Sequence, residues 1–150
     1  MSHSTFASGS TARTALFAAA AAALIAVGST ARAGDLTVEV QGIKSAQGEI
    51  AVGLFDQADQ FPKQVAHGLR LVATKDSVVA VFKDLKPGTY AISAYHDEND
   101  NKKLDRGLFG IPKEPYGFSQ EARGEGGPPQ FRDAQFEVPA DGGRVLIKLR

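Results

Sequence analysis

The chain of 150 residues contains no cysteine, and it also lacks a long uninterrupted apolar run. Without cysteine there is no disulfide, no lipid-modified N-terminal cysteine and no zinc site of the Cys/His type. The most apolar stretch, residues 15–27, has 13 residues, fewer than the ~20 that a helix needs to cross a bilayer. The apolar core alone must therefore stabilise the fold.

Residues 1–33 have the pattern of a cleaved secretory signal peptide. Arg13 supplies the positive charge, the apolar run follows, and Ala31-Arg32-Ala33 is a small-residue cleavage site. There is no twin-arginine pair. We expect cleavage between Ala33 and Gly34, and hence a periplasmic or secreted protein without a transmembrane segment. Residues 34–150 then form one domain by length.

The chain also lacks a large excess of charge of either sign. After removal of Arg13 and Arg32, 15 basic and 17 acidic residues remain, which gives a formal charge of −2. Such a balance provides no long-range attraction to nucleic acid or to anionic lipid. We expect no nucleic-acid partner.

Short segments in which apolar and polar residues alternate run through residues 34–150. They lie at residues 36–40, 50–54, 69–71, 79–81, 90–97, 134–138 and 145–149. Turn signals such as Pro87-Gly88 and Asp141-Gly142-Gly143 separate many of them. No segment has a long helical stripe. The pattern predicts an all-β fold, a seven-stranded antiparallel β-sandwich.

One region interrupts the alternation. From Asp97 to Arg132 there are 36 residues without a clear strand period, far more than the usual connection of about 4–6. Five apolar residues in it speak against disorder: Phe109, Ile111, Tyr116, Phe118 and Phe131. We expect one long ordered loop packed over an end of the sandwich, with Glu121 to Gly127 as its mobile tip.

Three stretches carry a resemblance to a known family. They are residues 90–105 (YAISAYHDENDNKKLD), 109–119 (FGIPKEPYGFS) and 128–131 (PPQF). With these stretches the chain resembles a bacterial exported family known as domain of unknown function 2141. The resemblance covers essentially all of residues 34–150 and implies a single exported β-sandwich without an established activity. The corner at Leu85–Tyr90 is also similar to transthyretin-like sandwiches, so we expect a transthyretin-like or immunoglobulin-like arrangement.

Short oxygen-bearing side chains follow the segment at residues 90–97. The candidate ligands are, in order, Asp97, Asn99, Asn101, Lys103 (through its carbonyl) and Asp105. They occupy positions 1, 3, 5, 7 and 9 of an EF-hand-like loop, and oxygen ligands of this kind suit calcium. The spacing predicts a weak calcium site, with a Kd of about 10⁻⁴–10⁻³ M.

Two features weaken the calcium interpretation. Position 6 is Lys102 where the turn and the family prefer glycine, and positive φ at a non-glycine residue costs roughly 1–2 kcal/mol. Position 12 is Leu108, so the usual bidentate carboxylate is missing. The alternative is an Asx-rich turn, in which these side chains accept hydrogen bonds from neighbouring backbone amides. Both interpretations stay open.

His96 and Glu114 are the candidates for acid–base chemistry. His96 lies on the inward row of its strand where the long loop begins, and Glu114 lies within that loop. Such a pair at the mouth of the loop would suit a small hydrolase-like enzyme. A lone histidine at a strand end is more often structural, and neither a G-x-S-x-G elbow around Ser119 nor an HExxH motif is present. The sequence favours a protein that is not an enzyme.

The candidates for ligand binding are Tyr116 and Phe118, together with His96 and Glu114 at the mouth of the loop. Aromatic rings carried on a loop over a rigid sandwich can stack on a sugar or hold a peptide, or they can fill the space beneath the loop. The leading hypothesis is an exported, non-catalytic binding or accessory module with an envelope or extracellular partner. The alternatives are the hydrolase-like enzyme, a carbohydrate- or peptide-binding protein, and a purely structural domain.

Overall fold

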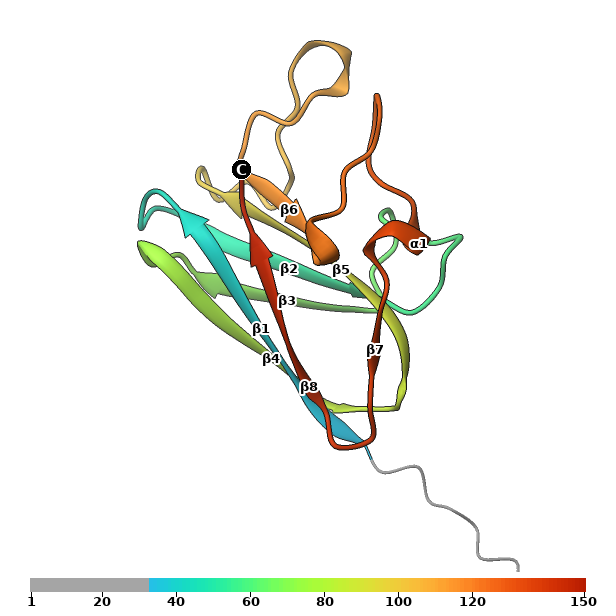
Figure 1. Cartoon of the computed structure of the whole chain (residues 1–150). Coiled ribbons are helices and arrows are strands. Elements are labelled where there is room, and N and C mark those ends of the chain that lie inside the picture. Colours follow the sequence, from blue (N-terminus) through green and yellow to red (C-terminus); the bar gives the residue numbers. More distant parts are fainter. Residues whose placement is uncertain (1–32) are drawn as a thin grey trace, which may run out of the picture.

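The structure, a computed structural model, describes residues 33–150, so the predicted signal segment lies outside the described residues except for Ala33. Strands dominate this part of the chain (Figure 1). The strands are β1 (Gly34–Ile43), β2 (Glu49–Phe55), β3 (His67–Val72), β4 (Asp76–Leu85), β5 (Gly88–Asp97), β6 (Tyr116–Phe118), β7 (Phe136–Val138) and β8 (Gly143–Lys148). The helical turns are η1 (Leu108–Gly110), η2 (Ser119–Glu121) and α1 (Phe131–Ala134). None of them has the length and apolar character needed to cross a membrane.

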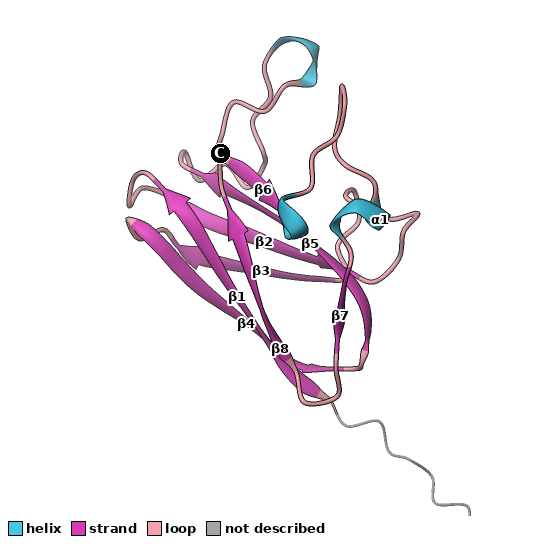
Figure 2. Ribbon diagram, in the orientation of Figure 1, coloured by secondary structure: helices cyan, strands magenta, loops and turns pink. Residues whose placement is uncertain are grey.

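The strands form two sheets (Figure 2). One has the order β4-β1-β8, and the other has the order β3-β2-β5, with β6 and β7 paired to the free edge of β5. β1 and β8 run parallel, and the other pairs of named strands run antiparallel. The predicted all-β sandwich is confirmed. The structure adds the short strand β6 and one parallel pairing to the seven antiparallel strands expected.

The main core follows from the two-residue alternation of side chains along the strands. In β1, Leu36, Val38 and Val40 are buried, while the polar residues between them remain partly exposed. Ile92 and Ala94 of β5 belong to the same buried cluster. Successive side chains of a strand point to opposite faces, so each sheet contributes one apolar row to the core.

A second hydrophobic cluster orders much of the long segment that follows β5. Ala91, which alternates with the core residue Ile92 along β5, belongs to this cluster. The ring of Phe61 lies edge-on to three other rings, with centroid distances of 5.0 Å to Phe55, 5.7 Å to Phe118 and 5.9 Å to Phe131. The prediction of an ordered loop is therefore confirmed for the part that carries Phe118 and Phe131.

The prediction was wrong for Phe109 and Ile111, which do not pack over the sandwich. Their exposed fractions are 97% and 64%, and that of the neighbouring Leu108 is 84%. The chain leaves the sandwich at Arg106 and returns at Pro112, where the two residues form an isolated β-bridge. This bridge directs the residues between them outward, away from the second cluster.

Ser119 fills a gap along the edge of β5. β6 pairs with Ser93–Tyr95 and β7 pairs with Gly88–Tyr90, which leaves a break between them. There, the backbone N–H of Ile92 donates to the fully buried Ser119 Oγ at 2.9 Å, and Ser119 Oγ donates to the carbonyl of Ala134 at 2.5 Å. The hydroxyl thus replaces a missing ladder bond and is occupied by structural contacts.

Substituting Ser119→Ala should lower the free energy of unfolding by about 1–3 kcal/mol, because the buried N–H of Ile92 and the carbonyl of Ala134 would both lose a partner. Urea unfolding followed by circular dichroism measures the change. The matched variant Ser77→Ala, at a half-buried serine in β4, should stay within about 0.5 kcal/mol of the parent. Equal effects in the two variants would contradict the role assigned to Ser119.

Candidate functional site

The loop after β5 closes on the carboxylate of Asp97, which is fully buried at the end of the strand. Asp97 Oδ1 accepts the backbone N–H of Asn101 at 3.0 Å, and Oδ2 accepts that of Lys102 at 2.8 Å. Oδ2 also accepts Nη1 of Arg70 on β3 at 3.1 Å. A buried carboxylate with three donors, one of them cationic, is well satisfied, so it fixes the start of the loop.

The two asparagines and Asp105 close the rest of the loop. Asn99 Oδ1 accepts the N–H of Asn101 at 3.1 Å, and Asn101 Oδ1 accepts that of Lys103 at 2.9 Å. Their side-chain nitrogens donate to the two carboxylate oxygens of Asp105, at 2.7 Å from Asn99 and 2.8 Å from Asn101. These are the bonds of an Asx-rich turn.

The hydrogen bonds from Asn101 and then Asn99 hold the pKa of Asp105 below its usual 3.8, and the charges of Lys113 and Lys103 act in the same direction. A carboxyl with a lowered pKa stabilises the folded state in its ionised form. This contribution is present above about pH 3.8, the unfolded value, and is lost as the pH falls through the folded-state pKa.

Lys102 has the left-handed conformation, with φ of 67°, at the position where the turn favours glycine. Its carbonyl accepts Nη2 of Arg70 at 3.0 Å, and its Nζ lies 2.7 Å from Glu49 Oε2 and 2.5 Å from Asp100 Oδ1. Hydrogen bonds to these two carboxylates raise the pKa of Lys102. The surrounding contacts thus hold the unfavourable conformation in place.

Glu114 supplies a second carboxylate to the same loop from the returning chain. It is largely buried, and its Oε1 and Oε2 accept the backbone N–H groups of Glu98 at 3.2 Å and Asp105 at 2.9 Å. Glu114 therefore ties the first and last residues of the loop together. Both of its carboxylate oxygens are thus occupied by backbone amides.

His96 is fully buried, and its Nε2 donates to the carbonyl of Gln47 at 2.7 Å. Its Nδ1 has no hydrogen-bond partner and lies 3.6 Å from Glu98 Oε1. Within residues 33–150, no hydrogen bond or ion pair joins His96 to Glu114. The pair on which the hydrolase-like alternative depends is therefore not assembled, and His96 has no exposed surface to offer a substrate.

A groove beside this loop is lined by both Tyr116 and Phe118, and their role in ligand binding stays a prediction. The groove lies between residues 104–112 and residues 124–128 and has a volume of about 410 Å³. Its apolar lining includes Leu104, Phe109, Ile111, Pro112, Phe118 and Pro128. The ring of Tyr116 stands 6.0 Å from that of Phe118, with the guanidinium of Arg150 5.8 Å from its centroid.

Sequence reasoning missed the exposure of Leu108 and the outward position of Phe109 and Ile111. The signal was present in the sequence Arg106-Gly-Leu-Phe-Gly-Ile-Pro112, in which glycines and a proline flank large apolar residues. Glycine and proline are typical of turns, and turns lie at the protein surface.

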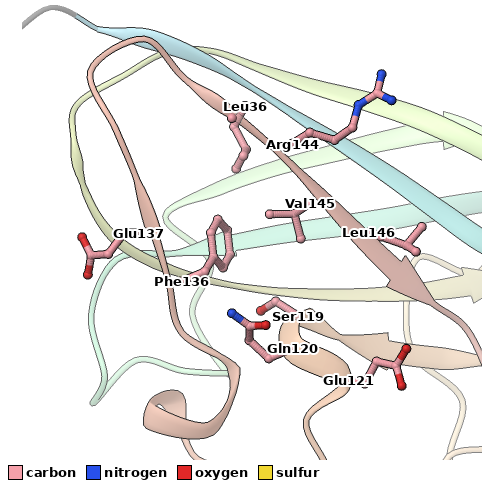
Figure 3. Close-up of a pocket in the computed structure, with 10 residues that line it drawn as sticks. Leu36, Ser119, Gln120, Glu121, Phe136, Glu137, Arg144, Val145 and Leu146 are labelled. Carbon is pink, nitrogen blue, oxygen red and sulfur yellow. The ribbon is translucent and has the colours of Figure 1, made fainter.

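A larger cavity of about 540 Å³ lies between β7 and β8 (Figure 3). Leu36, Phe136 and Val145 point into it, whereas Glu137 and Arg144 point away. Of its polar side chains, Ser119 is already bonded to backbone groups. This cavity is therefore a gap in the side of the sandwich without converging chemical groups, and the loop end is the better candidate site.

The family model described as "Uncharacterized protein conserved in bacteria (DUF2141)" matches residues 38–145, from within β1 to within β8. The chain belongs to this family. No curated protein and no solved structure matches the chain. Membership in DUF2141 confirms the predicted resemblance, and the family description assigns no activity. The likeness to transthyretin-like or immunoglobulin-like sandwiches stays a prediction.

The calcium site also stays a prediction, and the geometry favours an ion-free loop. In residues 33–150, no group of three or more His, Cys, Asp or Glu side chains is arranged to hold a metal ion. Asn99 and Asn101 turn their side-chain nitrogens toward Asp105, and their oxygens accept backbone N–H groups. To bind calcium, the loop would have to break these bonds.

Calcium should therefore leave the melting temperature unchanged. A site with a Kd of about 10⁻³ M would stabilise the fold by about 1.4 kcal/mol at ~10 mM calcium, which differential scanning calorimetry resolves as a shift of several degrees. Magnesium at the same concentration is the control for ionic strength. A rise that is specific to calcium and disappears in Asp105→Asn would establish the site instead.

Proposed function

We propose that this DUF2141 chain is an exported, non-catalytic binding module of the cell envelope or the extracellular space. The signal pattern of residues 1–33 supports export. The engagement of His96 and Glu114 in internal contacts argues against the hydrolase-like alternative. The loop end is then a surface for recognition and not for chemistry.

The groove that contains Tyr116 and Phe118 carries the proposal. It joins an apolar lining to backbone segments that carry no side chain of their own, since Gly110, Gly126 and Gly127 all line it. A Cβ added at any of the three glycines would meet no atom within 4 Å. An apolar groove with accessible backbone groups suits an extended peptide, whose side chains fill the groove while its amides reach the rim.

A carbohydrate ligand fits the same groove less well. Sugars need several polar side chains that fix their hydroxyl groups. Arg106 and Tyr116 are the polar side chains lining this groove, and Nη1 of Arg106 already donates to the carbonyl of Gly110 at 3.0 Å. Of the two ligands expected from the aromatic residues, the lining favours an extended apolar peptide of a partner protein.

Blocking the groove should abolish peptide binding without unfolding the protein. Gly127→Leu places a bulky side chain at a position where a Cβ has free space and φ does not require glycine. Binding to peptides selected on an array with the parent protein should weaken at least about tenfold, measured by fluorescence polarisation.

Gly68→Leu is the matched control. It lies on β3, where an added Cβ is 3.9 Å from Val65, and it should bind like the parent. Tyr116→Ala gives a second measure of the groove, with its melting temperature checked separately. If no peptide binds the parent, or if Gly127→Leu binds as well as Gly68→Leu, the groove is not the binding site.

A further inference from the structure

The loop between Arg106 and Pro112 projects from the end of the molecule opposite the start of β1 (Figure 1). Its large apolar side chains are exposed. Leu108, Phe109 and Ile111 have exposed fractions of 84%, 97% and 64%. Single exposed apolar residues are ordinary on protein surfaces, but three within four residues at the apex of a projecting loop form a concentrated apolar surface.

Hydrogen bonds hold this apex in its shape. The N–H of Gly107 donates to the carbonyl of Ile111 at 2.7 Å, and that of Lys113 donates to the carbonyl of Asp105 at 2.8 Å. Arg106 Nη1 reaches across the loop to the carbonyl of Gly110. Phe109 itself has φ of 62°, an unfavourable conformation for a phenylalanine, although its ring has almost no contact with the fold. The apolar residues are thus presented outward by a built turn.

Three exposed basic side chains, Lys103, Arg106 and Lys113, lie in the segment that forms the base of the apex, and we call them the cationic collar. The fourth basic residue of this segment, Lys102, is paired with Glu49 and Asp100 and does not belong to the collar. Lys103, Arg106 and Lys113 are exposed, and no ion pair involves them within the described residues. Asp105, the one acid, is held by the two asparagine side chains.

We propose that this apex inserts into the surface of an anionic phospholipid membrane. Leu108, Phe109 and Ile111 enter the boundary between headgroups and acyl chains, and the exposed cations contact lipid phosphates. Apolar side chains above a cationic collar are the chemistry that lipid interfaces recognise. The balanced overall charge predicts no long-range attraction, so the local collar and the apolar contacts supply the binding.

A protein partner fits these observations less well. Protein interfaces bury broad and fairly flat surfaces with few charges at the centre. Here the apolar side chains lie on a narrow projecting turn, and exposed basic residues lie in the segment at its base. Phe109 and Ile111 also line the groove, whereas Leu108 does not, so a substitution at Leu108 separates membrane binding from peptide binding.

Because the chain contains no tryptophan, a single introduced tryptophan can report membrane insertion by its fluorescence. In the chain that begins at Gly34, Phe109→Trp creates a single tryptophan at the apex. Its emission should shift to shorter wavelength with vesicles of phosphatidylethanolamine and phosphatidylglycerol, and lipids with brominated acyl chains should quench it. Val79→Trp, at an exposed position on β4, is the matched control and should not respond.

Two further variants separate the contributions. Leu108→Ser should weaken vesicle binding about tenfold or more, because it removes an inserted side chain without altering the groove. Lys103→Glu combined with Lys113→Glu should weaken it at least as much, since it reverses two collar charges. Gly127→Leu, which blocks the groove, should bind vesicles like the parent.

Absence of a spectral shift with the anionic vesicles would overturn the proposal, as would an equal response from Val79→Trp. Equal binding to vesicles of phosphatidylcholine alone would also overturn it, because the collar would then have no role. Self-association through the apex, detected by sedimentation velocity and abolished in Leu108→Ser, would overturn it in favour of a second copy of the chain as the occupant.

Discussion

Two buried carboxylates determine the shape of the loop end. Asp97 accepts the amides of Asn101 and Lys102, and Glu114 accepts those of Glu98 and Asp105. Neither is left with an unsatisfied charge, because Arg70 pairs with Asp97 and each Glu114 oxygen has an amide donor. A buried carboxylate is stable only when its donors stay in place, so the loop cannot rearrange without exposing or stranding a charge.

The position of these carboxylates explains why the loop can be rigid outside the sandwich. Asp97 ends β5, which β2 pairs along one edge and β6 and β7 pair along the other. The hydrogen bonds of Asp97 and Glu114 therefore order the start of the loop, as apolar packing orders the rest of the fold. The loop then keeps its shape without burying Leu108, Phe109 and Ile111. These exposed side chains can therefore contact a partner. The groove beside them forms because the Phe61 cluster anchors the returning chain.

Much of the architecture could be predicted from alternation and turn residues. The strand at residues 90–97 coincides with most of β5, and the predicted loop does gather Asp97, Asn99, Asn101, Lys103 and Asp105 into one network. These features are local, because the period of a strand and the bonds of an Asx turn are set by residues close in sequence.

The remaining features depend on contacts between distant parts of the chain. Arg70 lies on β3, 27 residues before Asp97, and nothing near either residue indicates their ion pair. β6 has three residues, too few for an alternation to be detected, and it forms because β5 offers a free edge. The burial of His96 and Glu114 likewise depends on how the loop folds back. The residue types alone do not indicate it.

Amide hydrogen exchange measured by NMR tests the two-carboxylate account most directly. The amides of Glu98, Asn101, Lys102 and Asp105 should be protected to within about tenfold of those in β5, because opening the loop would strand a buried charge. In the Asp97→Asn variant, the protection of the Asn101 and Lys102 amides should fall, while the protection of the β5 amides should not change. Exchange of these four amides in the parent protein at the rate of an unstructured peptide would contradict the account.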